Sequence, residues 1–158
     1  MKNLDKIDRR ILYELQRQGR LTNTELSERV HLSATATIER VRRLTRDGYI
    51  LGYSAVLSPK MLNRNLIVFI EVKLERTTPD IFEAFAKAAM ETEDLMECHM
   101  VAGGFDYLLK ARLPDMETYR SFLNDTILAL PGVRETHTYT VMEEVKNSRE
   151  IPVLTQED

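Results

Sequence analysis

The sequence of 158 residues lacks the features that mark secreted and membrane-spanning proteins. Cys98 is its only cysteine, which excludes an intramolecular disulfide and a thiolate metal cluster. No apolar run approaches the roughly 18 residues that a membrane-spanning helix needs. The first residues lead into charges rather than into the apolar core of a signal peptide. These absences predict a cytoplasmic protein with no membrane partner, and 43% hydrophobic with 30% charged residues predict a globular one.

The net charge of −3 hides an uneven distribution of charge along the chain. Residues 1–60 contain 12 Lys and Arg against 7 Asp and Glu, whereas residues 61–158 contain 10 against 18. A basic half can attract the phosphates of a nucleic acid, and an acidic half repels them. Small asymmetries of this kind are common, so the charge alone leaves DNA binding and an ordinary solvated surface equally open.

The spacing of apolar residues up to residue 50 predicts three helices. The first is expected from Asp5 to Gln18, and the second begins at a cap formed by Asn23 or Thr24. After a short turn at residues 31–33, Ser33 caps a third helix that ends near residue 47. The apolar faces of the three helices are expected to consist of Ile7, Ile11, Leu12, Leu15, Leu26, Val30, Ile38, Val41 and Leu44.

Two helices joined by so short a turn are typical of a helix-turn-helix, which presents its second helix to the major groove. His31 stands where the turn often has glycine, and histidine tolerates positive φ. Arginine reads guanine and binds phosphate, and threonine contacts bases. A solvated charged face, with Glu39 paired to Arg43, is the alternative. The candidate DNA-contacting residues are Asn23, Thr24, Ser33, Thr35, Thr37, Arg40, Arg42, Arg43 and Arg46.

Beyond residue 49 the pattern changes to that of strands. The β-rich residues 49–57 predict a strand, followed by a linker punctuated by Ser58-Pro59. The elements expected after residue 64 are strand Leu66–Leu74, a helix opened by Thr78-Pro79-Asp80, strands 96–102 and 107–113, a helix opened by Pro114-Asp115, and a strand from 133 to 145. This β-α-β-β-α-β order is typical of ferredoxin-like folds. The predicted fold class is α+β, with a helix-turn-helix domain at 1–50, a strand and linker at 51–64, a ferredoxin-like βαββαβ domain at 65–150 and a loose tail at 151–158.

Several segments, in order along the chain, resemble those of the Lrp/AsnC (feast/famine) family of transcriptional regulators, nearer to its leucine-responsive than to its asparagine-specific branch. These segments are residues 4–12 (LDKIDRRIL), 24–27 (TELS), 39–44 (ERVRRL), 103–110 (GGFDYLLK), 130–133 (LPGV) and 141–146 (VMEEVK). The resemblance implies a winged helix-turn-helix and a RAM-type domain that binds an amino acid. It also implies dimers that assemble into octamers or larger rings around DNA. Ala34 and Ala36, at the start of the third helix, stand where the family often has proline, and this departure bears on base specificity rather than on DNA binding.

The resemblance places an effector pocket between subunits, near the loop at residues 101–107. Gly103 and Gly104 would let backbone N–H groups approach a ligand carboxylate, and Asp106 could take the α-ammonium group. A Gly-Gly hairpin turn with a capping aspartate is the alternative. Leucine or methionine would suit walls of Met and Val, although several of these residues could equally be core or interface. The candidate effector-binding residues are Met100, Val101, Ala102, Gly103, Gly104, Asp106, Tyr107, Met116, Tyr139, Thr140 and Val141.

Two other functions stay open at this stage. Some relatives of the family decarboxylate tetrapyrroles with histidines, and His99 and His137 lie on predicted strands of one sheet. No acid, base or metal-binding constellation converges in the sequence, so we expect no enzyme, no metal and no cofactor. The other alternative is an architectural DNA-binding protein that assembles but senses nothing. The favoured hypothesis is a nucleoid-associated regulator in which an amino-acid effector changes ring assembly or half-site geometry.

Overall fold

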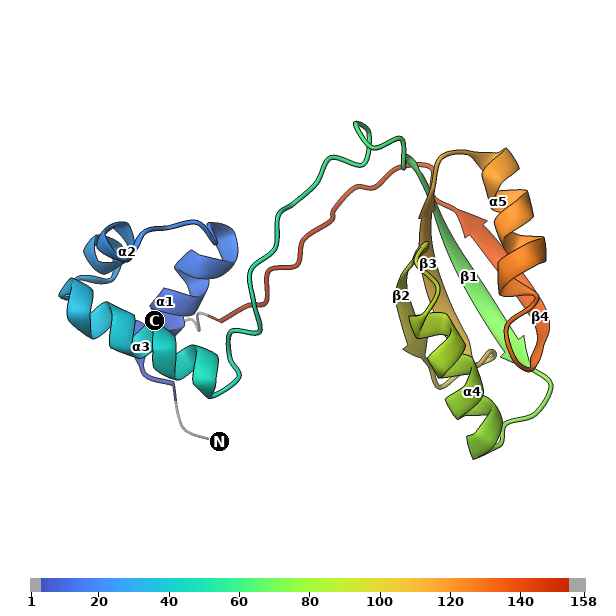
Figure 1. Cartoon of the computed structure of the whole chain (residues 1–158), viewed down its shortest axis with the longest axis horizontal. Coiled ribbons are helices and arrows are strands. Elements are labelled where there is room, and N and C mark those ends of the chain that lie inside the picture. The colour runs from blue at the N-terminus through green and yellow to red at the C-terminus, as the bar shows by residue number, and fades with distance from the viewer. Residues whose placement is uncertain (1–3, 154–158) are drawn as a thin grey trace. The chain divides into compact units, whose positions relative to one another are not determined.

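The computed structural model of the chain describes residues 4–153 and divides into two compact units (Figure 1). The first unit combines the chain up to Val56 with the segment from Lys146 onward, and the second is Leu57–Val145. Within the described residues, no helix is both long and apolar enough to cross a bilayer. The two units correspond broadly to the two domains predicted from the sequence, except at the C-terminal segment.

The first unit contains three helices, α1 (Lys6–Arg17), α2 (Asn23–Val30) and α3 (Ala34–Arg46). Ser33 caps α3 as predicted, because its side chain accepts a hydrogen bond from the Ala36 amide at 3.2 Å. The cap of α2 is Thr22 rather than Asn23 or Thr24. Thr22 and Glu25 form a reciprocal capping box that fixes the start of the helix there. His31 adopts φ 55 in the turn between α2 and α3, which confirms the expected left-handed conformation.

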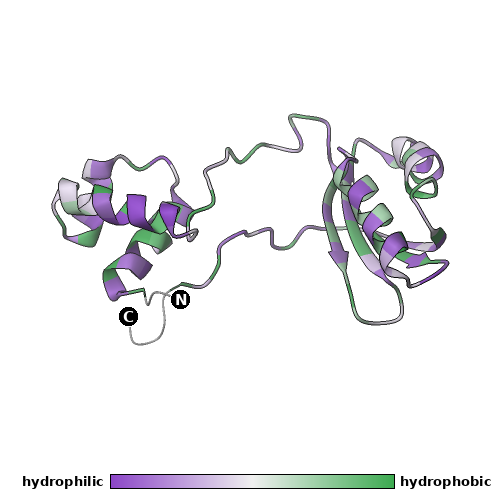
Figure 2. Ribbon diagram, turned by 60° about the horizontal axis from the view of Figure 1, so that its bottom comes forward, coloured by the Kyte–Doolittle hydropathy of each residue, from purple (hydrophilic) through white to green (hydrophobic). Residues whose placement is uncertain are grey.

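The core of the first unit is formed by Ile11, Leu15, Leu26, Val30 and Leu44. Figure 2 shows that α1, α2 and α3 each contain both hydrophilic and hydrophobic residues. This mixture is expected of amphipathic helices around a small core.

One face of α3 differs from the prediction. Thr37 was expected to face outward, but its side chain is 0% exposed, and Ile38, expected in the core, is only partly buried. Thr37, Val41 and Leu44 share one face by helical spacing, which leaves Ile38 at its edge. Burial of Thr37 is possible because its hydroxyl donates to the Ser33 carbonyl at 3.0 Å.

The strand predicted at residues 49–57 does not form, so the described part of the first unit has no wing strand. From Leu51 to Leu57 the chain belongs to no helix or strand, and Leu51 and Val56 are 95% and 100% exposed. A β-rich composition is insufficient because a strand needs a neighbouring strand to satisfy its backbone N–H and C=O groups.

The second unit is a four-stranded antiparallel sheet in the order β2-β3-β1-β4, and it confirms the predicted β-α-β-β-α-β succession. Its elements are β1 (Leu66–Leu74), α4 (Pro79–Met90), β2 (Leu95–Met100), β3 (Tyr107–Leu113), α5 (Met116–Phe122), the π-helical turn η1 (Leu123–Ile127) and β4 (Val133–Thr140). The last strand therefore ends five residues before the predicted residue 145. The predicted single helix after Asp115 is divided into α5 and η1.

Helices α4 and α5 cover one face of this sheet. Alternate residues of β1 and β3, including Ile70 and Leu109, are 0% exposed and pack with Phe85 of α4 and Phe122 of α5 in one core cluster. The residues between them point to the opposite face, against which no described helix of this unit packs. The other face of the sheet carries partly buried apolar and charged side chains, among them Phe69, Leu108 and Lys110.

The prediction of a loose tail from residue 151 is wrong for residues 151–153. The Ile151 amide donates to the side chain of Gln16 on α1, and the Ile151 carbonyl accepts from the same side chain. The Val153 carbonyl accepts from Arg9 at 3.2 Å. Figure 1 shows this segment returning to α1. Residues 146–150, predicted as the end of the ferredoxin-like domain, thus belong to the first unit, and residues 154–158 lie outside the described part.

Candidate DNA-binding and effector sites

Most of the predicted DNA-contacting residues lie on the surface at the starts of α2 and α3 or along α3. Asn23 and Thr24 are exposed in the first turn of α2, and Ser33 and Thr35 are exposed where α3 begins. The first turn of α3 contains no acidic residue, so its N–H groups can face an anion without a competing carboxylate on that turn. Thr37 is buried, and the prediction that its side chain contacts DNA is therefore wrong.

Arg42 and Arg46 form the exposed basic part of α3, with side chains 73% and 70% exposed. Arg42 pairs with Glu39 at 3.0 Å and Arg46 with Asp47 at 3.3 Å, and such exposed pairs are weak and easily exchanged. The Glu39–Arg43 pair considered as an alternative is absent, because Glu39 pairs with Arg42 and Arg43 points elsewhere. Both arginines can therefore turn toward a phosphate at small cost.

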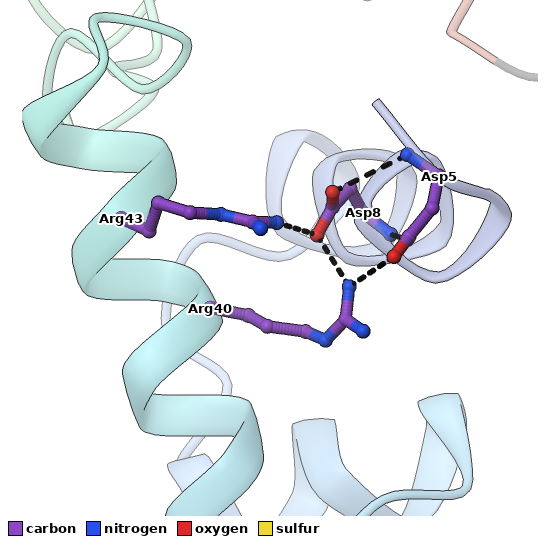
Figure 3. A network of polar contacts seen from close by, with 4 residues as sticks. All are labelled: Asp5, Asp8, Arg40 and Arg43. Carbon is purple, nitrogen blue, oxygen red and sulfur yellow. Dashed lines mark hydrogen bonds and ion pairs between the residues drawn. The ribbon is translucent and has the colours of Figure 1, made fainter. Parts of the chain in front are cut away.

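The guanidinium group of Arg40 lies between two carboxylates at the start of α1 (Figure 3). Its Nη1 donates to Asp5 Oδ2 at 2.6 Å and to Asp8 Oδ1 at 2.8 Å, and Arg43 donates to the same Asp8 oxygen. Asp8 is only 1% exposed, so its charge is held by two guanidinium groups rather than by water. Arg40 and Arg43, predicted to face outward, keep 27% and 40% of their side chains exposed.

This network shifts the pKa values of Asp5 and Arg40. Burial raises the pKa of the Asp5 carboxyl, but hydrogen bonds from Arg40 and the Asp8 amide outweigh burial and bring that pKa below its usual range. The hydrogen bond to Asp5 raises the pKa of the Arg40 guanidinium, against the opposing effect of burial. Both groups are therefore charged at neutral pH, and α3 is fixed on α1 by charge-assisted hydrogen bonds.

Sequence reasoning assigned no role to Asp5 and Asp8, although one signal was present. Asp8 stands three and seven residues before Ile11 and Leu15, on the stripe that forms the core face of α1. A carboxylate in such a stripe needs a buried partner. The arginines of α3 are the partners that the helix packing supplies.

In the second unit, the loop between β2 and β3 contains both predicted glycines. Neither Gly103 nor Gly104 has a positive φ, and a Cβ added to either would meet no atom of this chain within 4 Å. The loop joins β2 and β3 in a hairpin, as the alternative has it, but not through a two-residue Gly-Gly turn, because the favoured turns of that kind need a positive φ in at least one of these residues. Neither backbone conformation nor space within the chain therefore requires glycine at these two positions.

Asp106 and Tyr107 at the end of this loop also serve the fold. Asp106 Oδ2 accepts a hydrogen bond from the Leu74 amide at 2.8 Å, which ties the loop to the end of β1. The Tyr107 side chain is 2% exposed and stacks on Phe85 with ring centroids 4.3 Å apart. Tyr107 is thus a core residue, and the structure does not support its side chain as a wall of the loop site.

Several of the remaining effector candidates lie far from the loop within one chain. Tyr107 pairs with Val72 on β1, whereas Thr140 pairs with Val68, and four residues of strand span about 13 Å. Met100 lies beside the loop, while Tyr139 and Val141 lie near the other end of β1. Met116 follows β3 and is 49% exposed. The predicted residues therefore form two groups at opposite ends of the sheet.

The two strand histidines do not converge. His99 lies on β2 and His137 on β4, at opposite edges of the sheet and three strand spacings, or about 14 Å, apart. His99 contacts Glu97 at 3.2 Å, and the His137 ring contacts Tyr139. Nor do the described residues contain a group of His, Cys, Asp and Glu that could hold a metal ion. The expectation that these histidines could lie near each other is wrong.

Two models of known protein families match the chain, one in each half. Residues 4–50 match a winged helix-turn-helix DNA-binding model, and residues 67–151 match the Lrp/AsnC ligand binding domain. The leucine-responsive regulatory proteins of Klebsiella pneumoniae and Escherichia coli K12 are each 55% identical to this chain over 155 residues. The match covers 98% of this chain and 94% of each relative.

A solved structure resembles the chain over nearly its whole length. The transcriptional regulator NMB0573 of Neisseria meningitidis, crystallised as a complex with L-Met, superimposes with a TM-score of 0.91 at 38% identity. The match covers 96% of this chain and 97% of that one.

Proposed function

Because the chain belongs to the Lrp/AsnC family of transcriptional regulators, we propose that it binds double-stranded DNA through the exposed start of α3 and the exposed arginines farther along that helix. We further propose that an aliphatic amino acid, bound to the second unit, changes this binding. The domain models that match the chain are a winged helix-turn-helix DNA-binding domain and a ligand binding domain, and its relatives at 55% identity are leucine-responsive regulatory proteins, not enzymes. The chain is therefore a transcriptional regulator, and the proposal concerns which residues carry out its two binding functions.

The observation that carries the DNA-binding proposal is the accessibility of one end of α3. Thr35 and Ser33 are exposed at its start, and Arg42 extends from the following turns with a side chain 73% exposed. A recognition helix contacts base edges with its N-terminal residues, while arginines beside it bind phosphates. We assign base contact to Thr35 and phosphate contact to Arg42 and Arg46, with Asn23 and Thr24 of α2 next to the backbone.

Binding to duplexes selected from a random pool by the full-length protein tests this assignment. Thr35→Ala should lower the preference for selected over random duplexes, because it removes a base contact and leaves phosphate contacts unchanged. Arg42→Ala should weaken both complexes and make the salt dependence less steep. Arg134→Ala, which removes an exposed arginine of the second unit, is the matched control. Unchanged binding by both α3 variants would contradict the proposal.

The effector proposal is supported by the two glycines that this chain does not itself require. An added Cβ meets nothing within 4 Å at Gly103 or Gly104, so the backbone there is open to a molecule from outside the chain. Asp106 Oδ1 has no hydrogen-bond partner among the described residues, and it can accept a ligand ammonium while Oδ2 stays on Leu74. A relative of similar structure binds L-Met. We therefore propose leucine or methionine as the effector.

The opposite ends of the sheet enter one pocket only if two copies contribute to it. We propose that dimers form through the face of the sheet that α4 and α5 leave open. By register this face presents Phe69, Glu71, Leu108, Lys110, His137 and Tyr139, a mixture of apolar and charged side chains typical of an interface. Dimers that assemble further into octamers or larger rings would place several α3 helices on one DNA, in the cytoplasm and at the nucleoid.

A thermal melt of the full chain with each of the twenty amino acids tests the effector proposal. A ligand that binds only the folded protein raises its melting temperature. Asp106→Asn should lose this shift, because it keeps an oxygen for the Leu74 amide but removes the charge that binds an ammonium group. Unchanged midpoints with all twenty amino acids would favour the alternative of an assembling DNA-binding protein without an effector.

A further inference from the structure

The pairing of Arg40 with Asp5 bears on how strongly each α3 helix can bind DNA. We propose that Asp5 limits the DNA affinity of this regulator by binding Nη1 of the Arg40 guanidinium group, so that a phosphate competes with a carboxylate of α1 for this arginine. This inference rests on the proposed placement of α3 against DNA. Asp5 acts through Arg40 and is an affinity-limiting residue that need not touch DNA itself.

The two carboxylates that bind Arg40 differ in how readily each could release this arginine (Figure 3). Asp8 is 1% exposed and binds Arg40 and Arg43 together, so it is a permanent anchor between α1 and α3. The Asp5 side chain is 51% exposed, and of the two arginines it binds Arg40 alone. The Asp5–Arg40 contact can therefore open while the Asp8–Arg40 contact keeps the helices together.

Opening this contact leaves the start of α1 intact. Asp5 caps α1 with its other oxygen, Oδ1, which accepts from the Asp8 amide at 2.7 Å. Oδ2, which binds Arg40, is returned to water when its contact with Nη1 of Arg40 opens. A carboxylate half exposed to water loses little by this exchange. The cost to DNA is the ion pair between Asp5 and Arg40 that must be broken.

Weak DNA binding by each single helix-turn-helix is useful in a regulator that has several such units in one assembly. When several sites bind one DNA, each additional site multiplies the overall affinity. A helix-turn-helix that is weak on its own makes binding depend on simultaneous engagement. Because phosphate contacts occur on any sequence, Asp5 should reduce affinity for specific and random duplexes alike.

Asp5→Asn tests this inference, because asparagine caps helices as well as aspartate but carries no charge. We expect the full-length variant to bind both selected and random duplexes roughly two- to fivefold more tightly, the range expected from losing an exposed ion pair. The slope of log affinity against log salt should steepen by up to about one, since one more arginine is available to a phosphate. Asp5→Ser, which also caps but is too short for Arg40, should behave likewise. Unchanged or weaker binding by both variants, at an unchanged melting temperature, would overturn the inference.

Asp5→Asn in an Arg40→Ala background tests whether Asp5 acts by competing with DNA for Arg40 or only through its negative charge near DNA. If Asp5 acts through Arg40, Asp5→Asn should give no gain in that background. A gain of equal size would mean that any lost negative charge suffices, and would overturn the inference. Glu39→Gln, which removes an exposed carboxylate paired with Arg42, measures that general effect.

Failure of the inference can be told apart from failure of the proposed function. If Arg40→Ala leaves DNA binding unchanged while Thr35→Ala and Arg42→Ala weaken it, α3 contacts DNA as proposed but Asp5 has no role. If none of the three variants weakens binding, α3 does not contact DNA, and the proposed function fails with the inference.

Discussion

The backbone of Ile151 is hydrogen-bonded in both directions to one side chain of α1, that of Gln16. The Ile151 amide donates to Gln16 Oε1 and its carbonyl accepts from Gln16 Nε2, each at 2.9 Å. An amide side chain carries both an acceptor and a donor, so it can bind a backbone amide and a backbone carbonyl at once. The chain thus leaves the first unit near Val56, forms the second, and returns to complete the first.

Gln16→Ala should therefore release the C-terminal segment from α1. We expect the Ile151 amide to exchange with solvent more rapidly in the variant, measured by hydrogen exchange of the full chain, because its acceptor is gone. Gln16→Glu is the comparison, since it keeps an acceptor for the Ile151 amide while replacing the donor to the Ile151 carbonyl with a charged oxygen. Equal exchange rates in the wild type and Gln16→Ala would show that this contact does not hold the segment in solution.

Asp8→Ala should destabilise the first unit by about 1–3 kcal/mol, because it removes a buried carboxylate that accepts from two arginines. The loss stays below that of a fully buried ion pair, since Arg40 and Arg43 remain partly exposed and can be hydrated. Denaturant unfolding measures the change, and Asp5→Asn, with its cap preserved, should cost much less. Equal losses in the two variants would contradict the distinction between an anchoring and a releasable carboxylate.

Gly104→Ala should leave the fold unchanged and abolish the effector response. The added methyl group meets no atom of this chain within 4 Å, but it would occupy the space through which a ligand reaches the backbone. Melting curves with and without leucine or methionine measure both effects.

Gly132→Ala provides the contrasting control. Gly132 has a φ of +74, and an added Cβ would lie 2.7 Å from Ile81 Cγ2. This variant should lose about 1 kcal/mol or more of stability. A Gly104→Ala protein that still shifts its melting temperature would move the ligand away from this loop.

The pKa of Glu25 predicts how α2 responds to acid. Hydrogen bonds from the backbone and side chain of Thr22 lower this pKa below the ordinary 4.5, against a small rise from desolvation. A lowered folded pKa contributes stability that is present above about pH 4.5 and is lost as the pH falls through the folded value. Glu25→Gln keeps the capping box without the titration, so its stability should change less between pH 5 and pH 3 than that of the wild type. Parallel pH profiles would contradict this role of Glu25.

Periodicity and caps predicted most of the fold. The β-α-β-β-α-β order, the Ser33 cap and the left-handed His31 follow from local spacing and backbone preference, which the sequence displays directly. Where spacing left two choices, the sequence failed: Thr37 and Ile38 are adjacent, and only packing against α1 and α2 decides which is buried. The strand after Tyr49 failed because strand formation depends on a neighbour that composition does not reveal.

The candidate sites were less predictable because they depend on contacts between distant segments. The pairing of Arg40 with Asp5 joins residues 35 apart, and that of Gln16 with Ile151 joins residues 135 apart. No local pattern specifies such partners. The sequence predicted that Gly103 and Gly104 lie in a loop between two strands. Only the backbone conformation shows that neither the chain's φ angles nor its own atoms require glycine there.

Amino-acid binding and DNA binding are, in this proposal, linked within one regulator. The linkage is measured most directly by titrating the protein with DNA in the presence and in the absence of a saturating effector. We predict that leucine or methionine changes the affinity for a selected duplex, and that DNA changes the affinity for the amino acid by the same factor, as thermodynamic coupling requires. A DNA affinity that is identical with and without an amino acid shown to bind the protein would contradict the account.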